Sequence, residues 1–175
     1  MKNILIVVDM QKDFVDGALG SAEAVAIVDN VVNKIEAFEG DIIVTYDTHS
    51  ESYMETQEGK NLPVPHCIKG TDGWELDSKV QAALDNREYK AIEKPTFGST
   101  ELVEYIKASY DQADIAIELI GLCTDICVVS NALLIKANFL EAEVGVDASC
   151  CAGVTPDSHN AALTTMKMCQ INVTE

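Results

Sequence analysis

The stretch that decides the fold is IAIELIGLCTDICVVSNALLIKA, which runs from Ile115 to Ala137. It begins with an almost continuous apolar run of strand length, typical of a strand buried on both faces of a parallel sheet. After Gly121, the apolar spacing from Asp125 to Ala137 predicts a helix. A buried strand that turns directly into a helix is the repeating unit of parallel α/β proteins.

The same alternation recurs along the chain. Strand-length apolar runs occupy residues 4–8, 42–44, 91–92, 115–120, 144–146 and 171–173. Helical patterns lie between them, at residues 22–38, 76–84, 100–108, 125–137 and 157–168. This order predicts a doubly wound, mostly parallel six-stranded α/β sheet with helices on both faces, in a single domain spanning residues 1–175. The connection 48–73 shows no periodic pattern, and a connection of that length tends to be functional or disordered.

Charge and cysteine content limit the classes of partner. The formal net charge of −17 repels nucleic-acid phosphates and anionic membranes, so we expect neither as a partner. The six cysteines show neither a disulfide framework nor a paired zinc signature. The first apolar run is too short for a signal peptide or a membrane span. We therefore expect a cytoplasmic protein in a reducing compartment.

Two cysteines, Cys123 and Cys127, lie where the quoted strand turns into the quoted helix. Cys127 falls in the first turn of the expected helix, with Thr124 or Asp125 as its cap, where the helix dipole and free N–H groups stabilise a thiolate. Cys123 is then a turn residue. The alternative is that both are small buried apolar residues, as free cysteine often is.

A base and a cation are predicted close to this thiol. In doubly wound sheets the site lies beyond the carboxyl ends of the strands. Asp9 ends the first expected strand, and Lys94 follows the third. A nucleophilic thiol needs a base and a group that holds the pair together, and these two residues are the candidates. The alternatives are that Asp9 is a turn or cap residue and that Lys94 is a solvated lysine of a loop.

The connection 48–73 carries a candidate metal site. Asp47 and His49 are two residues apart, which places both side chains on one face of an extended segment. His66 follows in the same connection, and one aspartate with two histidines suits a divalent transition metal. The alternative is a surface connection that happens to contain two histidines.

Several motifs carry a resemblance to a known family. The blocks DMQKDF (Asp9–Phe14), EKPTFGS (Glu93–Ser99) and GLCTDICV (Gly121–Val128) resemble the signatures of the isochorismatase-like cysteine hydrolases. The pairing of DTH (Asp47–His49) with PHC (Pro65–Cys67) resembles the nicotinamidase branch of that superfamily, and DASCCAGVTPDSHNAAL (Asp147–Leu163) resembles its last strand–helix unit. The resemblance covers nearly the whole chain.

The resemblance implies a role for each residue of the thiol site. Cys127 is implied as the nucleophile, Asp9 as the general base and Lys94 as the third member of the triad. A cis peptide bond is implied between Leu122 and Cys123. The backbone N–H groups of Cys123 and Cys127 are then expected to form the oxyanion hole.

The resemblance also implies a bound metal and a flat aromatic substrate. Asp47, His49 and His66 are its expected ligands, with Glu58 as the fourth and Glu51 or Glu55 as alternatives. Zinc is the first choice of metal, with iron and manganese as alternatives, and its role is to hold the substrate's pyridine nitrogen. The expected apolar walls are Phe14, Leu19, Trp74 and Phe97.

The expected activity is hydrolysis of nicotinamide to nicotinate and ammonia through a thioester on Cys127, within NAD salvage. One alternative is a related amidohydrolase acting on a carbamoyl or ureido substrate, although those branches lack the metal residues. Another is a non-enzymatic redox or binding protein, for which the adjacent cysteines Cys150 and Cys151 are the support. We also expect a homo-oligomer, because this fold often assembles.

Overall fold

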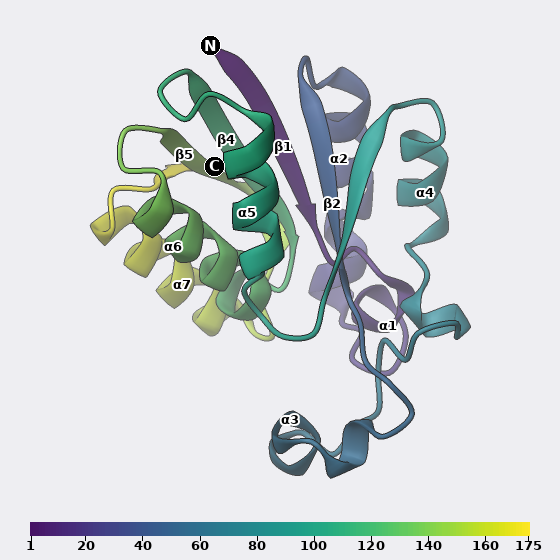
Figure 1. The fold of residues 1–175 in the computed structure, drawn as a ribbon. Coiled ribbons are helices and arrows are strands. Elements are labelled where there is room, and N and C mark those ends of the chain that lie inside the picture. Colours follow the sequence, from purple (N-terminus) through teal and green to yellow (C-terminus); the bar gives the residue numbers. More distant parts are fainter.

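A six-stranded sheet, parallel throughout, forms the centre of the molecule in the computed structural model, which describes residues 1–175 (Figure 1). The strands are β1 (Lys2–Val8), β2 (Asp41–Asp47), β3 (Tyr89–Lys94), β4 (Ile115–Leu122), β5 (Glu143–Ala152) and β6 (Asn172–Thr174). Their order across the sheet is β3-β2-β1-β4-β5-β6. The chain therefore builds outward in both directions from β1, which makes the β1–β4 junction the topological switch point.

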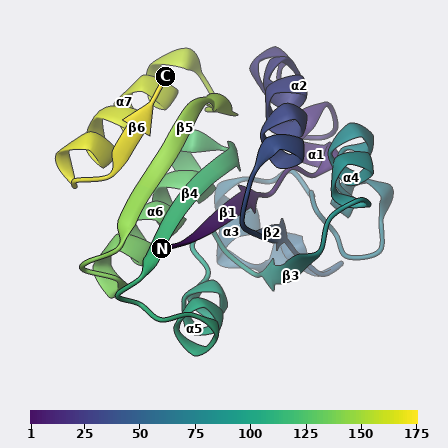
Figure 2. The same cartoon turned by 90° about the horizontal axis from the view of Figure 1, so that it is seen from above.

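Helices cover both faces of this sheet (Figures 1 and 2). The helices are α1 (Lys12–Val15), α2 (Ala22–Ala37), α3 (Gln57–Asn61), α4 (Ser78–Leu84), α5 (Thr100–Ser109), α6 (Val129–Asn138) and α7 (Pro156–Met168). Helices α1, α2 and α4 pack on one face, and α5, α6 and α7 pack on the other. The short helix α3 stands apart, below the sheet in Figure 1.

Each face of the sheet has its own hydrophobic core, because side chains alternate along a strand. In β1, Leu5 and Val7 enter the core under α2 and α4, whereas Ile4, Ile6 and Val8 enter the core under α5, α6 and α7. All five are fully buried. This explains why the central strands read as continuous apolar runs rather than as alternating ones.

The predicted fold class is confirmed, and every expected strand and helix is present with bounds that shift by a few residues at most ends. Two details differ from the expectation. The helix expected from Asp125 begins with a π-helical turn, Thr124–Val128, and α6 starts only at Val129. The connection 48–73 is ordered into α3 and two 3₁₀ turns, Tyr53–Glu55 and Asp72–Trp74, which are too short to show a period.

No helix in the structure is both long enough and apolar enough to cross a membrane.

Candidate active site

Four neighbouring strands deliver their carboxyl ends to one edge of the sheet. Asp9 directly follows β1, Asp47 ends β2, and Lys94 ends β3 beside Asp47 in the strand register. Gly121, near the end of β4, pairs with Val8. Because parallel strands all end at the same edge, residues more than 100 positions apart in the chain become neighbours here.

Gly121 allows β4 to come this close to β1. Its φ is +115°, a backbone conformation that side chains rarely adopt, and a Cβ atom there would lie 2.2 Å from the Val8 carbonyl oxygen. The peptide bond between Leu122 and Cys123 is cis, as the family resemblance implied. The chain then enters the π-helical turn that carries Cys127.

The triad residues Asp9, Lys94 and Cys127 meet in the interior. Lys94 Nζ lies 2.6 Å from Asp9 Oδ2 and 3.3 Å from Cys127 Sγ. The same ammonium group donates a hydrogen bond to the Thr96 carbonyl oxygen at 3.0 Å, and Asp9 Oδ1 accepts one from Thr45 Oγ1 at 2.6 Å. Asp9 and Lys94 are completely inaccessible to solvent, so neither charge is shared with water.

Burial is the largest influence on the pKa values of Asp9 and Cys127. Burial raises the pKa of Asp9, and the nearby Lys94 charge only partly offsets that rise. Burial also raises the pKa of the Cys127 thiol, and the Asp9 carboxylate raises it further, while Lys94 lowers it. Burial and the Asp9 charge therefore keep the Cys127 thiol protonated, whereas Lys94 opposes them. A base beside the thiol is needed to remove its proton.

A second cluster lies directly beside the triad. Asp47 Oδ2 is 2.9 Å from His49 Nε2 and 3.4 Å from His66 Nε2. Glu58 Oε1 is 3.6 Å from His49 Nε2 and 3.9 Å from His66 Nε2. Lys94 Nζ lies 3.5 Å from Asp47 Oδ1, so one lysine contacts both clusters.

Surrounding groups hold the two imidazoles in place. The His66 Nδ1–H donates to the Val64 carbonyl oxygen at 2.8 Å, which leaves Nε2 free to face the cluster. The buried Tyr53 ring lies 4.8 Å from the His49 ring and 5.0 Å from the His66 ring. Gly59 packs against the Tyr53 carbonyl, where a Cβ would approach to 2.1 Å, and this contact fixes α3 and with it Glu58.

The four side chains fit a divalent transition metal. One ligand atom from each of Asp47, His49, Glu58 and His66 lies within 4.8 Å of the others. Ligand atoms that bind one zinc ion at about 2.0–2.2 Å in tetrahedral geometry are roughly 3.4 Å apart, which is close to the contacts found here. Burial raises the pKa of Asp47, but hydrogen bonds from the two histidines outweigh burial and keep the pKa below its usual range. The group is thus a preformed set of nitrogen and oxygen donors.

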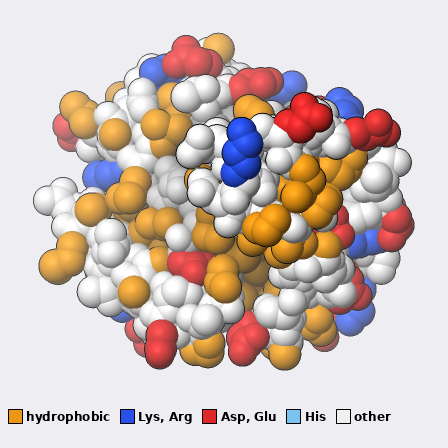
Figure 3. All heavy atoms as spheres, turned by 90° about the horizontal axis from the view of Figure 1, so that it is seen from below, with side chains coloured by type: hydrophobic (Ala, Val, Ile, Leu, Met, Phe, Trp, Pro, Cys, Tyr) orange, Lys and Arg blue, Asp and Glu red, His pale blue; other side chains and the backbone are white.

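The two clusters open into one apolar cavity of about 50 Å³. Its lining consists of Phe14, Leu19, Asp47, Glu58, Leu62, His66, Phe97, Cys123, Ile126 and Cys127. Three of the four expected walls are therefore at the cavity. Seen from the end of the molecule where α3 lies, apolar side chains gather across this face (Figure 3), and Met54, Leu62 and Phe97 are among the large apolar residues exposed to solvent.

Trp74 is the exception among the expected walls, because it does not line the cavity. Its ring packs 5.3 Å from the Tyr46 ring, and its indole N–H donates to Thr48 Oγ1 at 2.9 Å. The 3₁₀ turn Asp72–Trp74 is bonded to Gln11 through the Trp74 carbonyl, and the indole packs against the core under α2 and α4 that contains Tyr46. Trp74 was expected at the cavity because it lies near the metal motifs in sequence, but sequence distance does not determine where its ring points.

Sequence reasoning missed two buried polar residues at the site. The Gln11 side-chain amide bonds both backbone groups of Asp47, donating to its carbonyl and accepting from its N–H, each at 2.8 Å. Asn131 bonds three backbone groups around Cys127 and Phe97. The position of Gln11 inside DMQKDF was the available signal for the first, whereas nothing in the sequence distinguishes Asn131 from other helix residues.

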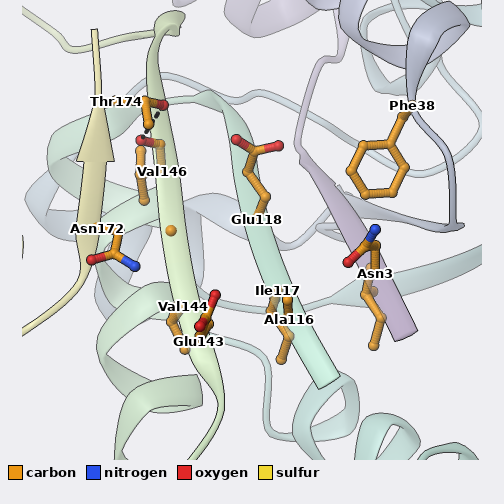
Figure 4. Close-up of a pocket in the computed structure, with 12 residues that line it drawn as sticks. Asn3, Phe38, Ala116, Ile117, Glu118, Glu143, Val144, Val146, Asn172 and Thr174 are labelled. Atoms are coloured by element: carbon orange, nitrogen blue, oxygen red, sulfur yellow. Dashed lines mark hydrogen bonds between the residues drawn. The ribbon is translucent and has the colours of Figure 1, made fainter. Parts of the chain in front are cut away.

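The adjacent cysteines and a second, larger cavity do not repeat the chemistry of this site. Cys150 and Cys151 are both buried and point into opposite cores, so they do not form an exposed thiol pair. A larger cavity of about 310 Å³ lies over the first halves of β1, β4 and β5 (Figure 4). It is lined by asparagines, two glutamates and aliphatic residues, with no cysteine, histidine or lysine among them.

The fold and site together define a class of protein. A parallel α/β sheet carries a buried Asp–Lys–Cys group at its topological switch point, beside a carboxylate–histidine cluster. The model of the isochorismatase domain matches residues 3–175, so the chain belongs to the isochorismatase family.

Individual relatives agree with this assignment. The chain is 30% identical over 143 residues to an uncharacterised isochorismatase family protein, PncA, of Bacillus subtilis, covering 76% of this chain and 78% of that protein. Among solved structures, it is similar to a nicotinamidase/pyrazinamidase PncA from Bacillus subtilis, with a TM-score of 0.87, 26% identity and complete coverage of both chains. A pyrazinamidase of Pyrococcus horikoshii in complex with zinc gives a TM-score of 0.80 and 26% identity, covering 100% of this chain and 99% of that one.

Proposed function

We propose that the protein hydrolyses nicotinamide to nicotinate and ammonia. The observation that carries this proposal is the single apolar cavity that Cys127 shares with Asp47, Glu58 and His66. A thiol at one side of a cavity and a metal-type cluster at the other suit a small flat amide with a second polar atom in its ring. The similarity to proteins named nicotinamidase and pyrazinamidase supports the same substrate class.

In the proposed mechanism, Asp9 accepts the proton of the Cys127 thiol as sulfur attacks the carboxamide carbon. The backbone N–H groups of Cys123 and Cys127 stabilise the resulting oxyanion. The carbon–nitrogen bond then breaks, and the leaving nitrogen takes its proton from Asp9 to depart as ammonia. Water, deprotonated by Asp9, attacks the remaining thioester and releases nicotinate and the free thiol.

Lys94 makes these proton transfers between Asp9 and Cys127 possible. Its ammonium contacts both Asp9 and Cys127, so a negative charge on either atom has a positive partner at short range. The charge moves between carboxylate and sulfur during the reaction, and the lysine lies within reach of both. This explains how a buried carboxylate and a buried thiol can lie side by side.

Asp47, His49, Glu58 and His66 would hold the metal, with zinc as the first choice and iron or manganese as alternatives. When bound, the metal supplies a Lewis acid for the pyridine nitrogen, which fixes the position of the ring. Phe14, Leu19 and Phe97 would pack against the faces of the ring. The lining residues Leu62 and Ile126 extend the same apolar wall.

The test is ammonia release from nicotinamide by the metal-loaded protein. We expect activity in the wild type, and a loss of about four orders of magnitude or more in Cys127→Ala, because the nucleophile is gone. Cys169→Ala is the matched control, because Cys169 is the exposed cysteine and lies outside the site. That variant should keep wild-type activity.

Metal depletion tests the second half of the proposal. Stripping the metal should abolish ammonia release, and adding zinc, iron or manganese back should restore it. If the folded, metal-loaded protein releases no ammonia from nicotinamide, the proposed substrate is wrong. Activity that survives metal depletion on a carbamoyl or ureido substrate would assign the protein to another type of amidohydrolase.

A further inference from the structure

Asn131 is a fully buried polar side chain that the proposed chemistry does not use. It lies on α6, one turn after Cys127. Its Nδ2 donates to the Cys127 carbonyl oxygen at 2.8 Å and to the Phe97 carbonyl oxygen at 3.1 Å. Its Oδ1 accepts a hydrogen bond from the Ser99 N–H at 2.9 Å. Three of its hydrogen-bonding positions are therefore used on backbone groups of two different segments.

The two segments are the two sides of the proposed active site. One is the π-helical turn that carries the nucleophile. The other is the connection from Lys94 to Ser99, which carries the Phe97 ring that lines the cavity. Lys94 bonds this connection at the Thr96 carbonyl, and Asn131 bonds it at Phe97 and Ser99. Lys94 and Asn131 together hold the connection against the nucleophile turn.

The Phe97 ring is 44% exposed, so packing covers only part of it and its position depends on the backbone that carries it. A connection that contains Gly98 has additional backbone freedom. Gly98 packs over α6, where an added Cβ would lie 3.5 Å from the Ser130 carbonyl oxygen, an ordinary van der Waals distance. The hydrogen bonds from Asn131 to Phe97 and Ser99 add directional constraints that van der Waals packing at the glycine does not supply.

We propose that Asn131 is a positioning residue that fixes the Phe97 wall relative to Cys127. It thereby sets how the aromatic ring of the substrate is held while its carboxamide faces the thiol. This inference rests on the proposed amidase function. Displacement of a reacting group by about 1 Å can cost roughly 10²-fold in rate, so a tether of this kind has a measurable effect.

Two substitutions separate the two halves of the tether. In a helix, a threonine hydroxyl donates to the carbonyl oxygen four residues earlier, and for residue 131 that is the Cys127 carbonyl. Asn131→Thr therefore retains the bond to the nucleophile turn and loses the two bonds to the Phe97–Ser99 segment. Asn131→Leu has a similar size and loses all three bonds.

The expected kinetics follow from this difference. Asn131→Thr should raise KM for nicotinamide about tenfold and leave kcat within about threefold of the wild type, because the wall moves and the nucleophile does not. Asn131→Leu should lower kcat/KM by about 100-fold. It should also change the rate at which iodoacetamide alkylates Cys127, measured by mass spectrometry, whereas Asn131→Thr should leave that rate unchanged.

Ser99→Ala is the matched control. The Ser99 hydroxyl caps α5 by accepting from the Leu102 N–H at 3.1 Å, so its loss destabilises the same region. The Ser99 backbone N–H and its bond to Asn131 remain in that variant. Thermal unfolding should show a lower midpoint in Ser99→Ala, while KM, kcat and the Cys127 alkylation rate stay at wild-type values.

Three results would overturn the proposal. The first is that both folded Asn131 variants keep the wild-type KM and kcat. The second is that Asn131→Thr loses kcat without a rise in KM. The third is that Ser99→Ala raises KM as much as Asn131→Thr does. If the wild type releases no ammonia from nicotinamide, the proposed function fails by itself. The alkylation rates then still decide Asn131, because equal rates in wild type and Asn131→Leu would show that the residue does not position Cys127.

Discussion

The Asp9–Lys94 pair shows how strongly a residue depends on its surroundings in this protein. Both groups are fully buried, and Asp9 Oδ2 has the Lys94 ammonium as its close polar neighbour. A buried ion pair contributes little net stability, because desolvation offsets the attraction between the charges. Removing one partner is much more costly, because the other charge then remains buried and unpaired.

Lys94→Met should therefore lower the free energy of unfolding by about 3–5 kcal/mol, measured by urea denaturation. The double variant Asp9→Asn with Lys94→Met should recover a large part of that loss, because it removes the unpaired carboxylate. Additive effects of the two substitutions would contradict the pairing. Ammonia release should be lost in both variants, so the double variant should regain stability without regaining activity.

The proposed fourth metal ligand is also a question at the scale of one residue. Glu58 faces both histidines, whereas Glu51 and Glu55 are exposed and lie outside the cluster. Glu58→Gln should weaken zinc binding by about 10-fold to 100-fold or more, because removing an outer-shell partner alone has that effect. The measurement is competition with a chelating dye, and Glu55→Gln is the control. Equal affinities in the two variants would assign the ligand elsewhere.

Among the elements, the π-helical turn Thr124–Val128 depends on α7. The two residues expected to cap a helix here make no cap hydrogen bond. Instead the Thr124 hydroxyl bonds His159 Nδ1 at 2.7 Å, and the Asp125 carboxylate accepts from the Val154 N–H at 3.1 Å. Both contacts hold the turn against the start of α7. Cys127 is therefore positioned by a distant helix as well as by its own turn.

The hydrogen bond between His159 and Thr124 makes the free energy of unfolding depend on pH. Burial lowers the pKa of His159, and the nearby Asp125 charge opposes that effect only in part. The folded protein therefore binds a proton at His159 less readily than the unfolded chain does. The stabilising contribution is fully present well above the unfolded pKa of about 6.5 and is lost as the pH falls through it.

His159→Asn should reduce the loss of unfolding free energy between pH 7.5 and pH 5.5, because a neutral amide cannot take up the proton. The measurement is urea denaturation of both proteins at the two pH values. All other titratable groups are the same in both proteins, so their contribution cancels in the difference. An identical loss in wild type and variant would show that the His159–Thr124 contact is not sensitive to pH.

For the whole molecule, the dominant electrostatic feature is the net charge of −17. Surface ion pairs such as Lys79 with Asp29 contribute little and weaken with salt. The repulsion among the excess carboxylates also weakens with salt, and it acts on the entire compact state. Because the charge imbalance is large, we expect salt to stabilise the protein by weakening this repulsion more than it destabilises the protein by weakening the ion pairs.

Raising sodium chloride from about 10 mM to about 0.5 M should therefore raise the thermal midpoint of the metal-free protein. The screening length falls from about 30 Å to below 10 Å over this range, which removes repulsion between carboxylates across the surface. Differential scanning calorimetry checks this directly. A midpoint that falls with salt would show that attractive ion pairs, and not repulsion, dominate the surface.

The sequence was sufficient wherever local pattern and topology carry the information. Continuous apolar runs predicted the strands, and their alternation with helices predicted the doubly wound sheet. That sheet in turn predicted where Asp9 and Lys94 would lie, because parallel strands end at one edge. The motif residues His49 and His66 could likewise be assigned to one cluster without coordinates.

Only the tertiary structure decided how the connecting segments direct their side chains. It packed Trp74 against Tyr46, placed Glu58 rather than Glu51 or Glu55 beside the two histidines, and raised the pKa of Cys127 through burial. It also brought Asn131 to the backbone of Phe97 and Ser99. The physical reason is that strands and helices repeat with a fixed period, whereas a connection of short turns has none. The direction and protonation of its side chains follow from packing and burial by distant parts of the chain.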